Sequence, residues 1–161
     1  MISIRELVLS DLESMIELFT DERVFANFDK GPWSKSRIEE SVLRNVSIWH
    51  SGQIGSHVIC KENRVIGKLI VFPNKDNEHE LGFVLHPSYW GKGYATVAGE
   101  LGINYLEFNT EVDHVVAFAR KSNVASIRVI QKLGFLQCDE RTGADGITRF
   151  KYIRSLASKR T

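Results

Sequence analysis

The sequence predicts a mixed α/β (α+β) fold in a single domain over residues 1–161. A chain of this length suits one domain with one core, and its 43% hydrophobic content is sufficient to fold without disulfides or a metal. Apolar residues recur at helical spacing in some segments and form strand-like runs in others. Taken in order, the segments read β-α-α-β-β-β-α-β-α-β-β, which predicts about seven strands flanked by helices.

The N-terminal part predicts one strand and two helices. Residues 2–9 form the strand, and Asp11 is the candidate N-cap of the first helix. Residues 29–32 are rich in helix-breaking residues and separate the two helices. Ser34 and Ser36 are equally good N-caps for the second helix.

The middle of the chain changes to strand patterns. Residues 54–60 and 65–72 predict an antiparallel hairpin, and residues 78–86 extend it by a third strand. A loop that contains two glycines follows. It leads into a helix whose apolar face runs from Tyr94 to Phe108.

The last part alternates strand and helix again. Residues 115–119 are a continuous apolar run, which is typical of a strand covered on both faces. Ser122 or Asn123 opens the next helix. Residues 135–141 and 147–154 then close the chain as a hairpin.

Composition and charge exclude several classes of protein. The net charge is +1, from 21 Lys and Arg against 20 Asp and Glu, which argues against nucleic acid or an anionic membrane as the partner. No apolar run approaches the ~20 residues of a membrane span. The N-terminus reaches a charge at Arg5 and lacks the apolar segment of a signal peptide. Cys60 and Cys138 form no CxxC pair and the histidines are scattered, so we expect reduced thiols, a cytoplasmic location and no metal site.

The most informative segment is Gly91-Lys92-Gly93, between a predicted strand and a predicted helix. Glycines let the backbone approach a ligand, and the first N–H groups of a helix have no partner inside it, so the loop predicts a phosphate site to which Lys92 adds charge. A turn that only redirects the chain is the alternative. A Walker A loop is excluded because Gly93 follows Lys92 where that motif has Ser or Thr, and a Rossmann fingerprint because Thr96 replaces its third glycine.

This loop resembles the acyl-CoA loop of the GNAT superfamily of N-acetyltransferases, whose pattern is Arg/Gln-x-x-Gly-x-Gly/Ala. Here it reads Trp90-Gly91-Lys92-Gly93-Tyr94-Ala95, with Trp90 departing at the first position. A second block, from Asn123 to Phe135, is similar to the next helix of the family and its Leu-Gly-Phe turn. With the segment that starts at Glu80, the loop resembles the ribosomal-protein N-terminal acetyltransferase (RimJ/RimL) branch. The resemblance implies one GNAT-like domain around a central, mixed, mostly antiparallel twisted sheet.

The resemblance also implies acetyl-CoA as co-substrate and a set of residues that bind it. Asn123 matches a position that hydrogen-bonds the pantetheine arm, and it is equally suited to cap the helix that it opens. Lys132 either lies near the phosphates or is an ordinary solvated lysine. The backbone contacts implied are to the pantetheine from Phe83, Val84 and Leu85, and to the pyrophosphate from Gly91, Lys92, Gly93, Tyr94, Ala95 and Thr96.

Two residues are the candidates for proton transfer. Glu80 matches the glutamate assigned as general base in the RimJ/RimL branch, and the alternative is a plain surface carboxylate like Glu78. Ile130 stands where many members of the superfamily have a tyrosine that acts as the general acid. Ser126 matches a serine used by some members of the branch, and it could equally be a small packing residue.

The acceptor is expected to be a primary amine, either a peptide or protein N-terminus or a small molecule. Residues 25–33 and 139–149 are the expected walls of its groove, with Asp29, Asp139 and Glu140 as candidates to attract a cation. Because the core uses nearly the whole chain, specificity must come from these segments or from a homodimer interface. The alternative function is an acyl-CoA-binding sensor or subunit with weak catalysis.

Overall fold

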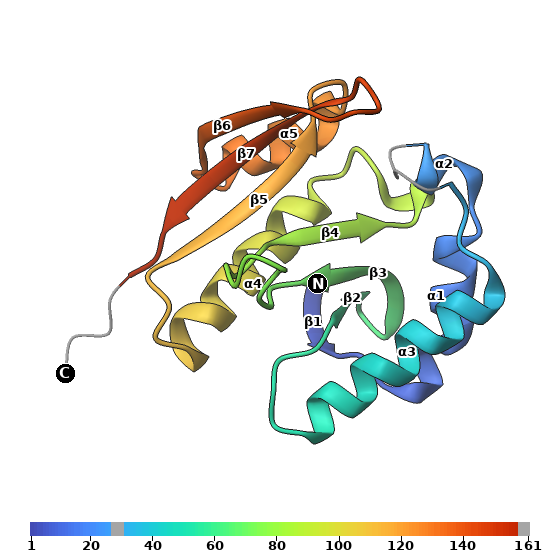
Figure 1. The fold of residues 1–161 in the computed structure, drawn as a ribbon. Helices are drawn as coiled ribbons and strands as arrows, with labels where there is room; N and C mark the ends of the chain where they lie inside the picture. The colour runs from blue at the N-terminus through green and yellow to red at the C-terminus, as the bar shows by residue number, and fades with distance from the viewer. Residues whose placement is uncertain (27–30, 158–161) are drawn as a thin grey trace.

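The computed structural model describes residues 1–26 and 31–157, and Figure 1 shows their arrangement. The described strands form two antiparallel sheets. The first has the order β1-β2-β3-β4, with β1 (Ile2–Glu6), β2 (His57–Lys61), β3 (Arg64–Ile70) and β4 (Gly82–Leu85). The second has the order β5-β7-β6, with β5 (His114–Arg120), β6 (Leu136–Thr142) and β7 (Thr148–Ser155).

Helices cover both faces of the larger sheet (Figure 1). On one face α1 (Leu12–Phe19) packs against α3 (Lys35–His50) and β3, and the short α2 (Glu22–Phe25) follows α1. On the other face α4 (Tyr94–Asn109) packs against β1, β3 and β4, and α5 (Val124–Lys132) packs against α4 and β5. Two 3-10 turns, η1 (Leu9–Asp11) and η2 (Pro87–Tyr89), lead toward α1 and α4.

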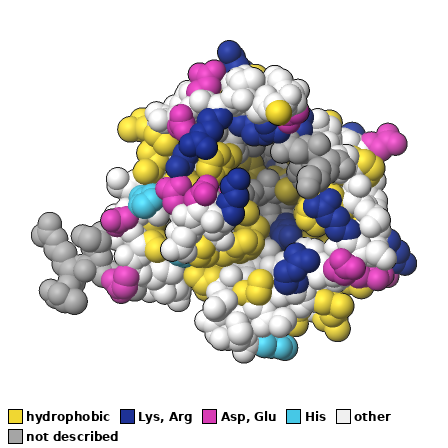
Figure 2. All heavy atoms as spheres, viewed as in Figure 1, with side chains coloured by type: hydrophobic (Ala, Val, Ile, Leu, Met, Phe, Trp, Pro, Cys, Tyr) yellow, Lys and Arg dark blue, Asp and Glu magenta, His cyan; other side chains and the backbone are white. Residues whose placement is uncertain are grey.

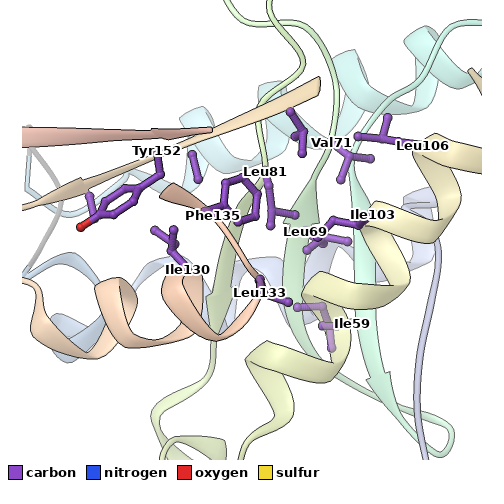
Figure 3. Packing of buried hydrophobic residues seen from close by; sticks show 14 of the residues in the cluster. Ile59, Leu69, Val71, Leu81, Ile103, Leu106, Ile130, Leu133, Phe135 and Tyr152 are labelled. Carbon is purple, nitrogen blue, oxygen red and sulfur yellow. The ribbon is translucent and has the colours of Figure 1, made fainter. Parts of the chain in front are cut away.

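Strand β2 explains why the fold has a core on each face of the sheet. Its side chains alternate between the faces, so Val58 joins the cluster under α1 and α3 while Ile59 joins the cluster under α4. Both side chains are fully buried. Figure 3 shows the cluster under α4, where Leu69 of β3 and Leu81, just before β4, pack near Ile103 of α4.

The predicted order of elements is confirmed, with two differences in detail. The one-turn helix α2 is an addition, because a segment of four residues is too short to show a helical period. The seven described strands divide into two sheets where the sequence predicted one central sheet. The reason is that, among the described residues, the segment just before β4 meets β5 through a single parallel bridge, between Glu80 and Val116, after which the two strands separate.

The helix caps agree with the sequence at two positions and differ at one. Ser34 caps α3 by accepting a hydrogen bond from the Arg37 N–H at 3.2 Å. Asn123 caps α5 in the same way. Asp11, the candidate cap of α1, instead accepts two hydrogen bonds of 2.9 Å from the guanidinium of Arg5. Burial opposes ionisation of Asp11, but the Arg5 bonds and a backbone N–H bond outweigh it and hold the pKa of Asp11 below its usual value.

No helix within residues 1–26 and 31–157 is both long enough and apolar enough to cross a membrane. Both cysteines are free thiols, Cys60 buried and Cys138 exposed.

Candidate active site

The divergence of β4 and β5 creates the site, and the hydrogen bonds next to it show how. The N–H of Leu81 donates to the carbonyl of Val116 at 2.8 Å, and the N–H of Val116 donates to the carbonyl of His79 at 2.9 Å. In the segment that contains His79 and Leu81, the odd-numbered residues therefore direct their backbone N–H and C=O groups toward β5. Beyond this point β5 turns toward β7, with which it pairs along its whole length, and it leaves β4 (Figure 1).

The even-numbered residues of the same segment direct their backbone N–H and C=O groups toward β3. The N–H of Glu80 donates to Phe72 at 3.1 Å and the N–H of His86 donates to Ile66 at 2.8 Å. Since the hydrogen bonds of an antiparallel pair alternate, Val84 uses its backbone groups toward β3, where it stands opposite Lys68.

Phe83 and Leu85 consequently direct their backbone N–H and C=O groups into the opening that β5 has left. Trp90 occupies one of these groups, because its indole Nε1–H donates to the carbonyl of Leu85 at 2.8 Å. The remaining groups form a short exposed strand edge, which can pair with an extended amide-bearing ligand.

The glycine loop places the start of α4 beside this edge. Gly91 and Gly93 have φ of 72° and 79°, in the left-handed region that favours glycine. Gly93 is the N-cap of α4 in this conformation, and its carbonyl accepts the first helical bond, from the N–H of Val97. The N–H groups from Gly93 to Thr96 have no acceptor inside the helix and, with the helix dipole, make an anion site.

The N-terminus of α5 forms the opposite wall of the opening. The Asn123 side chain accepts a hydrogen bond from the N–H of Ser126 at 3.2 Å. Both side chains line two of the three cavities described next, the loop cavity and the central cavity. Ile130, one turn further along α5, is buried, so the position where the superfamily often has tyrosine presents only a hydrocarbon side chain.

Three adjacent cavities extend along the opening. The loop cavity, about 430 Å³, lies between β4, the glycine loop and α5. The central cavity, about 570 Å³, lies between β4, β5, α5 and the α1–α3 layer, and it shares Phe83, Val84, Asn123 and Ser126 with the loop cavity. The hairpin cavity, about 400 Å³, lies against β6 and β7 and shares Phe118 and Arg149 with the central cavity.

Glu80 and Glu78 differ in their electrostatic environment although they are two residues apart. Burial raises the pKa of Glu80, and a hydrogen bond with Asn74 offsets part of that rise. Glu78 accepts a hydrogen bond of 2.7 Å from Lys151, with His114 3.3 Å away, and these partners hold its pKa below the usual value. Glu80 is thus the carboxylate with the higher proton affinity, while Glu78 is engaged in ion pairs.

The structure brings most of the predicted site residues to the loop cavity and leaves two elsewhere. Lys92 is exposed and does not line that cavity. Glu80 lines the hairpin cavity instead. The predicted residues that do line the loop cavity are Phe83, Val84, Leu85, Gly91, Gly93, Tyr94, Ala95, Thr96, Asn123 and Ser126.

Among the basic residues of the cavities, the sequence indicated Lys132, and the others were missed. Arg128 and Lys132 lie four residues apart on α5 and both line the loop cavity. Their i, i+4 spacing was the available signal. Arg37 and Lys68 line the central cavity, and nothing local to the sequence connects α3 with β3.

The expected acceptor residues divide between the cavities and the core. Trp33 lines the central cavity, whereas Phe25 is 8% exposed and belongs to the core. Asp139 and Glu140 line the hairpin cavity. Asp29 and Phe28, also expected at the acceptor groove, lie outside the described residues. Among the residues that the structure describes, no group of three or more His, Cys, Asp or Glu side chains is arranged to hold a metal ion.

The family of this chain follows from a match over most of its length. Residues 2–136 match the family described as the acetyltransferase (GNAT) domain. The chain belongs to the GNAT acetyltransferase family. It is accordingly an N-acetyltransferase, and the resemblance seen in its glycine loop and in α5 is confirmed.

Named relatives and solved structures agree with this family. An uncharacterized N-acetyltransferase of Bacillus subtilis, YnaD, is 27% identical over 133 residues, which is 81% of this chain and 76% of the relative. The structure of RimL, a ribosomal L7/L12 α-N-protein acetyltransferase in complex with coenzyme A, superposes with a TM-score of 0.83 at 17% identity, over 96% of this chain and 94% of that one. The structure of the spermidine N-acetyltransferase of Vibrio cholerae, in complex with CoA and spermine, superposes with a TM-score of 0.80 at 16% identity. The superposition covers 98% of this chain and 96% of that one.

Proposed function

We propose that this GNAT enzyme transfers the acetyl group of acetyl-CoA to a primary amine, by direct attack of the amine in a ternary complex. The acceptor is a protein or peptide N-terminal α-amine or the amine of a small molecule. The observation that carries the proposal is the backbone edge formed by Phe83 and the Leu85 N–H, which has no partner among the described residues and lies beside the start of α4. Two structural neighbours solved with coenzyme A support it.

The loop cavity fits coenzyme A in both shape and chemistry. The pantetheine arm is an extended chain with two amides, which suits the exposed edge of β4 at Phe83 and Leu85. Val84 contributes its side chain rather than its backbone, since its backbone faces β3. The pyrophosphate suits the N–H groups at the start of α4, with Arg128 and Lys132 supplying positive charge from α5.

The proposed chemistry needs a neutral amine, a polarised thioester and a proton for the thiolate. When bound, acetyl-CoA supplies an activated acetyl group: the amine nitrogen forms a bond to the carbonyl carbon, and the carbon–sulfur bond breaks. The N–H of Phe83 is the candidate to polarise the carbonyl oxygen. Glu80 accepts the proton of the amine. Because Glu80 lines the hairpin cavity and the amine lies in the neighbouring central cavity, a water molecule carries the proton between them. Ser126, in the wall of the loop and central cavities, donates a hydrogen bond to the departing sulfur, which takes its proton from water while the proton on Glu80 returns to the solvent.

A non-catalytic acyl-CoA-binding protein is the second candidate function. Buried Ile130 favours it, because this residue cannot supply the proton that a tyrosine would donate at the same position. Such a protein would bind acetyl-CoA and release no thiol in the presence of amines.

Thiol release from acetyl-CoA tests the proposal directly. The panel consists of peptides with different first residues, free amino acids, polyamines and aminoglycosides, and calorimetry measures acetyl-CoA binding in parallel. We expect binding and acceptor-dependent thiol release. Binding without release for the whole panel would favour the non-catalytic protein, and no binding would refute both functions. A cytoplasmic location is part of the proposal, in keeping with the free thiols of Cys60 and Cys138.

A further inference from the structure

The central cavity, where the acceptor must lie under the proposed function, has a strongly one-sided charge. Four basic side chains line it: Arg37, Lys68, Arg120 and Arg149. No Asp or Glu occurs among the described residues that line it. Figure 2 shows Lys and Arg side chains on several sides of the hollow in this face. The hairpin cavity, in contrast, mixes both signs of charge. With a net charge of only +1 for the chain, this basic character belongs to the cavity and its neighbour, the loop cavity, rather than to the chain as a whole.

Lys68 is the central element of this arrangement. It lies on β3, in the middle of the larger sheet, and its ammonium is near two aromatic rings, 5.4 Å from the ring centre of Phe19 and 5.9 Å from that of Trp33. Within the part of the chain that the structure describes, no carboxylate pairs with it. Desolvation, together with the like charge of Arg44, lowers the pKa of Lys68 to about 8. Ring faces compensate an ammonium only in part, so an anion in the cavity would stabilise its charged form.

Arg37 completes a binding surface next to Lys68. Its guanidinium carbon lies 4.1 Å from the centre of the Trp33 ring, and Trp33 in turn stacks on Phe19 at 4.8 Å with 15° between the ring planes. The stack fixes the plane of the guanidinium while its N–H edge stays available for hydrogen bonds. A guanidinium and an ammonium that line the same cavity match the oxygens of a carboxylate or phosphate.

The position of this surface relates it to the reaction. The cavity that holds Lys68 and Arg37 reaches Phe83 and Ser126, which also line the loop cavity. An acceptor with its anionic group at the α1–α3 end would therefore have room to direct its amine toward the thioester. A volume of about 570 Å³ is in the range of a small-molecule site.

We propose that the acceptor amine carries an anionic group, a carboxylate or a phosphate, which Lys68 and Arg37 bind. The proposal rests on the proposed function and narrows its substrate class. Polycations such as polyamines and aminoglycosides are poor acceptors on this view, because they would place positive charge against Lys68 and Arg37.

Matched pairs of acceptors test the proposal, because each pair shares its amine and differs in the anion. The pairs are leucine with leucinamide, phenylalanine with phenylalaninamide, phosphoethanolamine with ethanolamine, and a dipeptide amide with Glu or Gln in second place. Thiol release is compared at equal concentrations of the neutral amine. We expect kcat/KM to be at least about tenfold higher for the anionic member of one or more pairs, as expected for a charge-assisted hydrogen bond. The pair that responds identifies the source of the anion.

Substitution of Lys68 provides the second comparison. Lys68→Met should bring the anionic-to-neutral ratio close to one, mainly through KM, and Lys68→Arg should retain it. Lys35→Met is the matched control, since Lys35 is an exposed lysine at the start of α3 that does not line the cavity. Equal use of both members in every pair, or an unchanged ratio in Lys68→Met, would overturn the proposal.

Binding of the products separates this proposal from the proposed function. Calorimetry compares N-acetylleucine with N-acetylleucinamide, and N-acetylphosphoethanolamine with N-acetylethanolamine, without any turnover. Tighter binding of the anionic product, lost in Lys68→Met, supports the anion site even in a preparation that does not acetylate. If acetyl-CoA binds and neutral amines are acetylated as well as anionic ones, the proposed function stands and the anion site is refuted.

Discussion

At the scale of single residues, environment rather than residue type distinguishes the candidate catalytic groups. Glu78 and Glu80 are identical side chains on the same segment, yet ion pairs engage one and burial raises the proton affinity of the other. Sequence could point to Glu80 only by resemblance. The difference in pKa comes from the burial of Glu80 and from the Lys151 and His114 partners of Glu78, which lie far from Glu78 along the chain.

Glu80→Gln tests the general base. We expect kcat to fall about 100-fold with little change in the KM for acetyl-CoA, because a general base acts in the transition state. Since burial raises the pKa of Glu80, activity of the wild type should decline at a higher pH than for an ordinary glutamate as the pH is lowered. That decline should disappear in Glu80→Gln. Glu78→Gln is the control and should stay within about threefold of the wild type. A wild-type kcat for Glu80→Gln would exclude this residue as the base.

Ser126→Ala tests the proton donor. A serine is a weak acid, so its loss should lower kcat by about tenfold, less than the loss of Glu80. Stopped-flow measurement of thiol release in a single turnover separates this effect from product release. Ser122→Ala, an exposed serine just before α5, should leave kcat unchanged. If both serine variants behave alike, Ser126 is a packing residue.

At the scale of elements, the start of α4 combines a left-handed glycine turn with N–H groups that have no acceptor inside the helix. Gly93 provides the turn because it adopts φ of 79°, and α4 provides the N–H groups because its first turn lacks internal acceptors. The sequence predicted the glycine turn and the start of the helix, since both are local features. Lys92, by contrast, was predicted from the same local pattern and does not line the loop cavity. Side-chain direction within a turn depends on backbone angles that the pattern does not specify.

Gly93→Ala separates the turn from general stability. Gly52→Ala is a matched control, because both glycines have positive φ and open space where a Cβ would lie. Each substitution should cost about 1–2 kcal/mol of unfolding free energy, from the left-handed backbone alone. Only Gly93→Ala should also raise the KM for acetyl-CoA, by about tenfold, as its N–H groups shift. Urea unfolding and steady-state kinetics measure the two effects, and an equal KM for both variants would contradict this assignment.

At the scale of the whole molecule, His57 couples the packing of three elements to pH. It is 2% exposed at the start of β2, and its ring meets Trp49 of α3 and Tyr105 of α4 edge to face. Its Nδ1 has no hydrogen-bond partner among the described residues. Desolvation lowers the pKa of His57 to about 4. The folded state therefore keeps this imidazole neutral where an unfolded chain would protonate it.

Stability should fall on mild acidification for this reason. The unfolded state takes up a proton on His57 near pH 6.5 while the folded state does so only near pH 4, so the stabilisation is present above 6.5 and lost toward 4. The free energy of unfolding should drop by about 2 kcal/mol between pH 7 and pH 5 from this group. Urea unfolding at both pH values measures it. His57→Gln should remove that part of the slope, whereas His50→Gln, an exposed position on α3, should not. Equal slopes in all three proteins would show that His57 is not responsible.

The sequence by itself determined the order of the elements, the glycine loop and the family, and it narrowed two of the helix caps to two candidates each. These are local properties: hydrophobic period, a glycine at positive φ and a capping side chain each act within a few residues. Only the tertiary structure decided that the strands divide into two sheets and that Asp11 pairs with Arg5 instead of capping α1. It also decided that Lys68 of β3 and Arg37 of α3 both lie near the ring of Trp33. The physical reason is that charge pairing, burial and the direction of a strand edge depend on segments that meet only after folding.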